Sequence, residues 1–153
     1  SETFSAVSAP IQHAAIQAYE GNHKNYIRSS KEILKAVGNY VYENLNSNNI
    51  LINKSQGGFY LMPEFINAKS KFSSSSEMCK NILKKTGVAL LPGSDFGFDK
   101  KRMLARLSFT DFDGKHFMEE YDKGNHLNNK LIENLAPKIA EGVDKLKKWS
   151  ESL

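Results

Sequence analysis

Arg106 is the side chain in this sequence best suited to binding a small organic anion. It follows a polar loop that contains Pro92, Gly93, Ser94 and Gly97, and the apolar residues on either side of it predict a strand. Arginine keeps its charge at physiological pH and holds a planar carboxylate through two parallel hydrogen bonds. A fixed cation on a strand beside a glycine-hinged loop therefore predicts a carboxylate site.

The other reactive side chains indicate no second site. The single cysteine, Cys79, lies on the apolar side of a predicted helix and is expected to be a core residue. His13 lies near the start of another predicted helix and is expected to pack or to form a hydrogen bond, whereas His116 and His126 lie in the polar C-terminal third. None of these has partners at metal-ligand spacing, and there is no Ser-His-Asp order or Gly-x-Ser-x-Gly motif. The sequence therefore predicts no metal site and does not support hydrolase chemistry.

Composition indicates one globular domain. The 153 residues are 40% apolar and 25% charged, and no apolar run approaches the roughly 20 residues that span a bilayer. One cysteine cannot form an internal disulfide, which favours a reducing compartment and a cytoplasmic location. The net charge of +4 is spread along the chain, and the densest lysine cluster, at 145–148, shares its predicted helix with Glu141 and Asp144. No nucleic-acid-binding motif accompanies the charge, so neither a nucleic acid nor a membrane is expected as a partner.

The periodicity of the apolar residues predicts helices that alternate with short strands. Helices are expected over residues 10–20, 24–45, 75–86, 115–121 and 137–150. Ser74 and Glu77 stand at capping-box spacing at the start of the third helix, and Gly87 stands at its C-terminal cap. Strands are expected over residues 50–52, 58–62, 88–91 and 104–110. We therefore predict an α+β fold, an α/β two-layer domain in which a small mixed sheet of three or four short strands packs against helices.

Three segments resemble, in order and in spacing, the class I and II aminotransferases of fold-type I, which use pyridoxal phosphate. Segment 8–15, Ser-Ala-Pro-Ile-Gln-His-Ala-Ala, is similar to the one that follows the cofactor lysine in that family. Segment 56–61, Gln-Gly-Gly-Phe-Tyr-Leu, is similar to its Gly-Gly-aromatic strand. Segment 87–97, together with Arg-Leu-Ser-Phe at 106–109, is similar to the signature of the small domain. The resemblance covers about residues 5–112, and the closing helix at 136–149 is a weaker likeness.

The resemblance implies that residues 1–153 are the C-terminal small domain of such an enzyme, with 1–23 as the segment that connects it to a missing large domain. The family's cofactor lysine precedes the segment matched at 8–15, whereas the first lysine here is Lys24. The cofactor residues are therefore expected upstream of Ser1. We expect no catalytic and no cofactor-binding residue in this chain, and no pyridoxal 5'-phosphate bound by it alone, although the full-length parent would use that cofactor.

The resemblance also implies that Arg106 matches the family arginine that binds the substrate's α-carboxylate. Ser94 is expected as a weaker substrate contact, residues 57–60 are expected to supply sheet packing, and Arg28 and Arg102 match no family site and are expected to face solvent. The parent would be a homodimer that transfers an amino group between an amino acid and a 2-oxo acid. Two alternatives remain open. One is another fold-type I enzyme, such as a carbon–sulfur lyase or a cyclopropane-carboxylate synthase, and the other is a non-enzymatic carboxylate-binding or scaffold domain.

A missing large domain would leave apolar surface uncovered. The predicted helices over 10–20 and 24–45 both carry apolar stripes. In the family the second of them begins at the junction between the domains, so part of its face would lose its cover. We therefore expect an exposed apolar face larger than the few hundred Å² usual for a monomer, with a tendency to self-associate.

Overall fold

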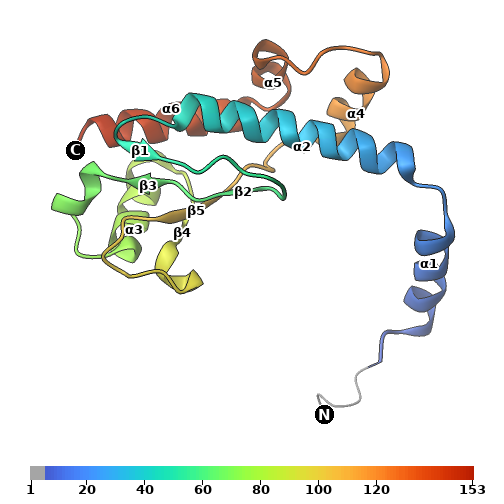
Figure 1. The fold of residues 1–153 in the computed structure, drawn as a ribbon, viewed down its shortest axis with the longest axis horizontal. Helices are drawn as coiled ribbons and strands as arrows, with labels where there is room; N and C mark the ends of the chain where they lie inside the picture. The colour runs from blue at the N-terminus through green and yellow to red at the C-terminus, as the bar shows by residue number, and fades with distance from the viewer. Residues whose placement is uncertain (1–5) are drawn as a thin grey trace.

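The computed structural model describes residues 6–153, which form six α-helices and five short strands around one hydrophobic core (Figure 1). The helices are α1 (Ala9–Glu20), α2 (Lys24–Leu45), α3 (Ser75–Thr86), α4 (Gly114–Asp122), α5 (Asn129–Leu135) and α6 (Pro137–Glu151). The strands are β1 (Ile50–Leu51), β2 (Tyr60–Leu61), β3 (Glu64–Phe65), β4 (Leu91–Pro92) and β5 (Ala105–Ser108). Short 3₁₀ turns, η1 (Asn67–Ser70) and η2 (Gly93–Phe96), follow β3 and β4. The predicted α+β class is confirmed.

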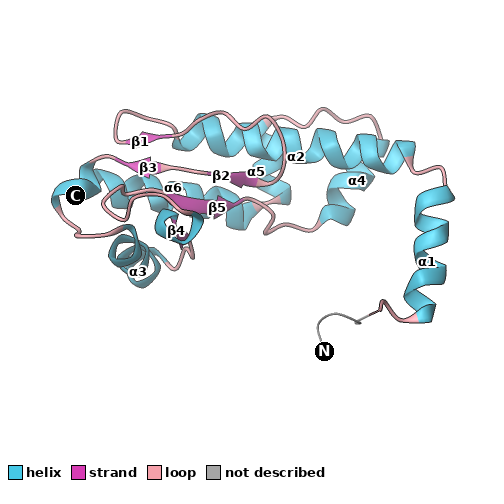
Figure 2. Ribbon diagram, turned by 60° about the horizontal axis from the view of Figure 1, so that its bottom comes forward, coloured by secondary structure: helices cyan, strands magenta, loops and turns pink. Residues whose placement is uncertain are grey.

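Two long helices, α2 and α6, form one side of the core. The apolar residues that α2 buries recur every four positions, at Ile33, Val37, Val41 and Leu45, so a single face is covered. The buried apolar residues of α6 are spaced three or four apart, and Pro137 starts the helix. Figure 2 shows the strands as a layer beside these two helices. No helix within residues 6–153 has the length and apolar character needed to cross a membrane.

The strands form a three-stranded sheet in the order β2-β5-β4 and a two-stranded sheet of β1 and β3. Every pairing between the described strands is antiparallel, so the prediction of a mixed sheet is wrong. The connections between paired strands are long enough to allow either direction, and the sequence pattern alone did not distinguish them. In β5, Ala105 and Leu107 are buried while Arg106 and Ser108 lie on the opposite face. The central strand therefore carries Arg106 on the outer side of a sheet whose inner side closes the core.

All four predicted strands differ at their ends from the observed ones: 50–52 and 104–110 are trimmed to β1 and β5, and the other two change more. The predicted strand at 58–62 is confined to β2, Tyr60–Leu61, which ends before Pro63. The Pro63 carbonyl still accepts a hydrogen bond from the Ala105 N–H at 3.0 Å, and β3 follows directly. Proline lacks only the N–H, so its carbonyl can continue a ladder. Residues 88–90 form no strand pairing, and β4 is confined to Leu91–Pro92. The Val88 N–H donates instead to the Thr86 hydroxyl at 3.0 Å.

The predicted caps of α3 are confirmed. The Ser74 hydroxyl accepts a hydrogen bond from the Glu77 N–H at 3.2 Å. The Glu77 carboxylate accepts bonds from the hydroxyl and the N–H of Ser73, at 2.7 and 2.9 Å, one residue before the partner that a capping box would use. These bonds lower the pKa of Glu77. At the other end, Gly87 adopts φ 76°, the left-handed conformation of a C-terminal cap.

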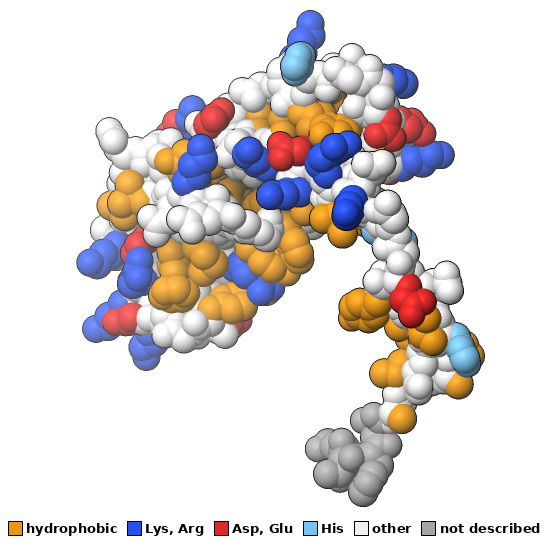
Figure 3. All heavy atoms as spheres, turned by 45° about the vertical axis from the view of Figure 1, so that its right-hand side comes forward, with side chains coloured by type: hydrophobic (Ala, Val, Ile, Leu, Met, Phe, Trp, Pro, Cys, Tyr) orange, Lys and Arg blue, Asp and Glu red, His pale blue; other side chains and the backbone are white. Residues whose placement is uncertain are grey.

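The helix α1 extends away from the rest of the chain and buries none of its residues (Figures 1 and 3). Its side chains Ile11 and Tyr19 are exposed, as are Tyr26 and Ile27 in the first turn of α2. These side chains provide the exposed apolar face predicted for the first two helices. Its area and any self-association stay predictions. The role of 1–23 as a connecting segment also stays a prediction, and the first five residues lie outside the described part.

Candidate carboxylate-binding site

Arg106 lies at the centre of the outer face of the three-stranded sheet. Its strand, β5, lies between β2 and β4, and Arg106 is directly opposite Leu91 of β4. Tyr60 of β2 is paired with Ser108, two residues beyond Arg106, so Tyr60 and Arg106 are diagonal neighbours on one face. The strand is hydrogen-bonded on both sides, which gives the Arg106 side chain a rigid base.

Two aromatic rings contact the guanidinium of Arg106. Its Cζ lies 4.3 Å from the ring centroid of Tyr60 and 4.3 Å from that of Phe96. Tyr60 belongs to β2 and Phe96 to η2, which directly follows β4, so the rings come from elements on opposite sides of β5. Both distances are well within the roughly 6 Å range of cation–π attraction. The rings therefore stabilise the cation through their faces.

The N–H donors of Arg106 have no acceptor within residues 6–153, since neither a hydrogen bond nor an ion pair joins its side chain to another described residue. Arginine presents its donors at the edge of a planar group, where a carboxylate can accept two of them at once. The geometry suits a carboxylate that approaches in the plane of the guanidinium. Binding of such a ligand stays a prediction.

Arg102, four residues earlier, has a different partner. It donates from Nε to Glu64 Oε1 at 3.1 Å and from Nη2 to Glu64 Oε2 at 2.5 Å, a two-point ion pair. These hydrogen bonds lower the pKa of the Glu64 carboxyl. The Arg102 Cζ also lies 5.6 Å from the ring centroid of Phe98. The expectation that Arg102 faces solvent is therefore incomplete, because its exposed guanidinium is paired within the chain.

The loop that was predicted to hinge beside Arg106 is fixed to β5. The Gly93 N–H donates to the Leu104 carbonyl at 2.7 Å, and a Cβ at position 93 would lie 2.9 Å from that same carbonyl oxygen. Gly97 ends η2 with φ 83°. Ser94 accepts a hydrogen bond from the Ser75 hydroxyl at 3.3 Å and lies 3.5 Å from a carboxylate oxygen of Asp95. The Ser94 hydroxyl is therefore held by its own chain, and its contact with a substrate stays a prediction.

Cys79 and His13 lie outside this site. Cys79 is buried, as predicted, and burial raises the pKa of its thiol to about 11, with a smaller contribution from the nearby Asp95 carboxylate. A thiol that stays protonated is a poor nucleophile. The prediction that His13 packs or forms a hydrogen bond is wrong for residues 6–153, because the side chain is exposed on the unpacked helix α1 and forms no hydrogen bond there.

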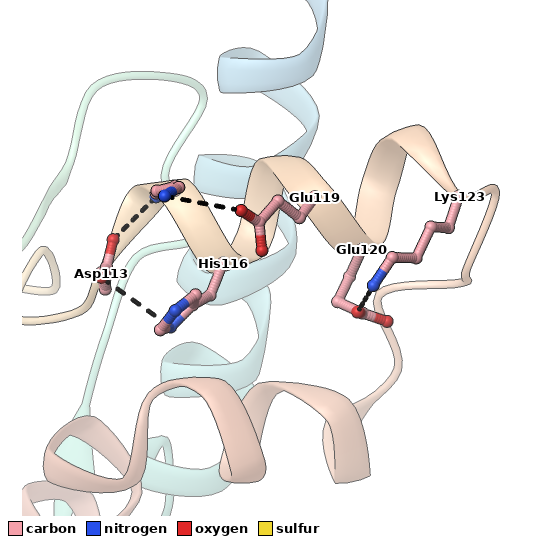
Figure 4. Close-up of polar contacts among 6 residues, drawn as sticks. Asp113, His116, Glu119, Glu120 and Lys123 are labelled. Atoms are coloured by element: carbon pink, nitrogen blue, oxygen red, sulfur yellow. Dashed lines mark hydrogen bonds and ion pairs between the residues drawn. The ribbon is translucent and has the colours of Figure 1, made fainter.

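His116 lies among the surface polar contacts of α4, as Figure 4 shows. Its Nδ1 lies 3.8 Å from a carboxylate oxygen of Asp113, the residue that caps the helix. One turn further on, Lys123 pairs with Glu120 at 2.6 Å. Such exposed pairs contribute little to stability. Within residues 6–153 no group of three or more potential ligand side chains could hold a metal ion.

The sequence did not single out the two rings that hold Arg106. Residues 57–60 were assigned to sheet packing, yet the Tyr60 ring lies on the outer face against the guanidinium, and Phe96 was not assigned a role. The available signal was the strand alternation, which places Tyr60 and the buried Leu61 on opposite faces of β2. It could not give the register that brings Tyr60 to Arg106.

Known proteins resemble this chain over most of its length. Aspartate aminotransferase of Bacillus sp. (strain YM-2) is 33% identical over 89 residues, which are 56% of this chain and 22% of that protein. Aspartate aminotransferase of Thermotoga maritima is 31% identical over 110 residues, which are 72% of this chain and 26% of that protein. The chain thus spans about a quarter of the length of these curated relatives.

Solved structures show the same fold. Alanine aminotransferase from Pyrococcus furiosus superposes with a TM-score of 0.68 at 23% identity, over 95% of this chain and 30% of that one. An aromatic aminotransferase from Pyrococcus horikoshii gives a TM-score of 0.65 at 19% identity, over 93% of this chain and 31% of that one. The family model for aminotransferase class I and II matches residues 1–117, more than half of the sequence. The chain therefore belongs to the class I and II aminotransferase family.

Proposed function

We propose that this chain is the C-terminal small domain of a pyridoxal-phosphate-dependent aminotransferase and that Arg106 binds the α-carboxylate of its amino acid and 2-oxo acid substrates. The observation that carries the proposal is the guanidinium of Arg106, which stands on a rigid central strand with no acceptor among residues 6–153. Membership of the family supports the reaction class.

The contribution of this domain to the reaction would be orientation. A carboxylate held at two points on a planar guanidinium loses most of its rotational freedom, and the bond that reacts is then presented in one direction. Ser94 is a secondary candidate, because its hydroxyl already contacts Ser75 and Asp95. We propose that the complete enzyme acts as a homodimer and, from the single cysteine of this chain, in the cytoplasm.

The surroundings of Arg106 do not fit the cofactor itself. Pyridoxal phosphate is held by a lysine, by a carboxylate at its ring nitrogen and by donors to its phosphate. The groups that contact the Arg106 guanidinium within residues 6–153 are two aromatic rings. The first lysine, Lys24, lies at the start of α2, after the segment that resembles the one following the cofactor lysine. We therefore propose that the cofactor is held by other parts of the complete enzyme.

The chain by itself is therefore expected to form no stoichiometric bond to pyridoxal phosphate and to transaminate nothing. The measurement is incubation with the cofactor, reduction with borohydride, digestion and mass spectrometry, together with an assay of amino transfer. Scattered labelling of exposed lysines below stoichiometric level agrees with the proposal. One lysine labelled stoichiometrically, with activity to match, would contradict it.

The carboxylate site can be tested directly because the chain has three arginines, Arg28, Arg102 and Arg106. Labelling with ¹⁵N-arginine gives three Nε–Hε signals, which are followed during titration with pyruvate. We expect saturable shifts at Arg106, none at the paired Arg102, and only a weak, non-saturating response at the exposed Arg28. Methyl pyruvate, in which a methyl ester replaces the free carboxylate, is the control. Equal responses of all three signals would rule out a specific site at Arg106.

A further inference from the structure

We propose that Tyr60 and Phe96 form an aromatic clamp that fixes the plane of the Arg106 guanidinium, so that they act as positioning residues for carboxylate binding. The substrate part of this inference rests on the function proposed above. The clamp itself rests on the two distances of 4.3 Å from Arg106 Cζ to the ring centroids of Tyr60 and Phe96.

The clamp and a carboxylate would use different parts of the guanidinium. Aromatic rings attract a cation through the negative potential over their faces and contact the flat side of the guanidinium. The N–H donors lie in the plane of the group and point outward from its edge. Stacking therefore leaves the donors available, whereas an acidic partner would occupy them. Arg102 shows that outcome within the same chain, because both of its contacts with Glu64 use edge donors.

Each ring is anchored to the strand that carries Arg106. Tyr60 is paired with Ser108 in the β2–β5 ladder, and its ring lies 4.4 Å from that of Phe59. Phe96 ends η2, whose first residue, Gly93, donates to the Leu104 carbonyl just before β5 begins. Backbone hydrogen bonds to β5 and to the residue just before it therefore hold the backbone of both ring residues beside Arg106.

The rings also leave an approach open. The exposed fractions of Tyr60 and Phe96 are 39% and 40%, high for large side chains that contact a neighbour. No hydrogen bond joins the Tyr60 hydroxyl to another described residue. The contact between Tyr60 and Arg106 is therefore made by the ring and not by the hydroxyl. An arginine with a long, flexible side chain is thus held in one orientation at a surface that a small anion can reach.

The test uses ¹⁵N-arginine-labelled chain and the variants Tyr60→Leu and Phe96→Leu, which keep an apolar side chain and remove the aromatic face. In the unmodified chain we expect an Arg106 Nε–Hε group that is ordered in ¹⁵N relaxation, shifted upfield by ring currents, and close to both rings in nuclear Overhauser spectra. Each leucine variant should lose order and ring-current shift, and should bind pyruvate about 2- to 5-fold more weakly. Tyr60→Phe and Phe96→Tyr, which keep an aromatic ring, should keep the order, the ring-current shift and the pyruvate affinity of the unmodified chain.

Phe98→Leu is the matched control, because Phe98 has the same exposed fraction, 39%, and lies near Arg102 instead of Arg106. It should leave the Arg106 signal and the pyruvate affinity unchanged. If a variant does not fold, the Overhauser contacts between Arg106 and the rings of Tyr60 and Phe96 in the unmodified chain still test the clamp. The clamp is overturned if those contacts are absent, or if both leucine variants keep the relaxation and the shift of Arg106. If pyruvate leaves the wild-type Arg106 signal unmoved, the proposed function fails, and the Overhauser contacts and relaxation then decide whether the clamp exists.

Discussion

Arg102 and Arg106 lie four residues apart in the sequence, but their guanidinium groups have different partners. Arg102 donates two hydrogen bonds to Glu64 and has a weaker aromatic contact at 5.6 Å. Arg106 has two aromatic contacts at 4.3 Å and no acidic partner among residues 6–153. A carboxylate partner neutralises an arginine and occupies its donors, whereas aromatic partners hold the cation and leave the donors unused.

The difference follows from where the two residues lie. Arg102 precedes β5, at the end of the sheet where Glu64 of β3 forms a bridge with Leu104. Arg106 lies within β5, where its directly opposed neighbour is the apolar Leu91. Position in the sheet thus decides which arginine is paired with a carboxylate and which has no acidic partner among residues 6–153.

The largest expected effect is the loss of Arg106 in a complete enzyme that carries this chain. Arg106→Ala removes one partner of a charge pair in a partly desolvated site, which typically costs about 2–5 kcal/mol. We therefore expect kcat/KM to fall by roughly 30-fold to several thousand-fold for amino acid and oxo acid alike, with Arg106→Lys between. Arg102→Ala, whose arginine is paired within the chain, should leave kcat/KM nearly unchanged. Near-normal kinetics for Arg106→Ala would remove the residue-level support for the function.

The next effect concerns the turn that carries Phe96. In Gly93→Ala the new Cβ would lie 2.9 Å from the Leu104 carbonyl oxygen, which belongs to the backbone and cannot turn aside. Overpacking of this kind costs about 1–3 kcal/mol in the free energy of unfolding, and relaxation of the turn should move Phe96 off Arg106. Urea denaturation and the Arg106 ¹⁵N signal are the measurements. Gly57→Ala is the control, since a Cβ there meets nothing within 4 Å. Equal changes in stability and in the Arg106 signal for the two variants would contradict the prediction that the contact with Leu104 causes the effect.

Helices with a clear apolar period could be predicted almost to the residue. The spacing of the apolar residues gave the bounds of α2, and Ser74 and Gly87 gave those of α3. The helix α5 was missed because it has only seven residues, too few to establish a period, even though Asn128 caps it with a bond to the Leu131 N–H at 3.0 Å. Strands of two residues, such as β3, are likewise too short to show alternation.

The site could be predicted only in its central residue. Arg106 was identified from the motif that contains it, and the structure places it on a strand as expected. Its contacts with Tyr60 and Phe96 depend on the register of β2, β5 and β4 and on the turn after β4. The pairing of Arg102 with Glu64 depends on the bridge between Glu64 and Leu104. Register and turn geometry are tertiary properties, so these contacts had no local signature.

A smaller effect is expected when Arg106 is given the kind of partner that Arg102 has. Leu91 is 46% exposed and directly opposite Arg106, so Leu91→Glu places a carboxylate within reach across the strands. A cross-strand ion pair of about 0.2–1 kcal/mol should weaken pyruvate binding by up to about 5-fold. The neutral Leu91→Gln is the matched control and should bind pyruvate normally. Equal weakening by both variants would show that the change acts through shape and not through charge.

The smallest effect is expected from Glu64→Gln, which removes the charge that holds Arg102. The pKa of Glu64 is lowered in the folded chain by its hydrogen bonds from Arg102, so the stabilisation is fully present above the carboxyl's ordinary pKa of about 4.3. It is lost as the pH falls through the lowered value. Exposed pairs are weak, so the melting temperature at pH 7 should fall by no more than about 4 °C.

The pH dependence of this loss and the behaviour of Arg106 together test the comparison between the two arginines. The melting temperatures of Glu64→Gln and the unmodified chain should converge in acid, where the carboxyl of the unmodified chain becomes protonated and neutral as well. The released Arg102 should then respond to pyruvate in the ¹⁵N titration, while the Arg106 signal keeps its wild-type affinity. A Glu64→Gln variant in which Arg102 stays silent would show that an unpaired arginine on this surface is not sufficient for carboxylate binding. The aromatic clamp around Arg106 would then be the feature that distinguishes the two residues.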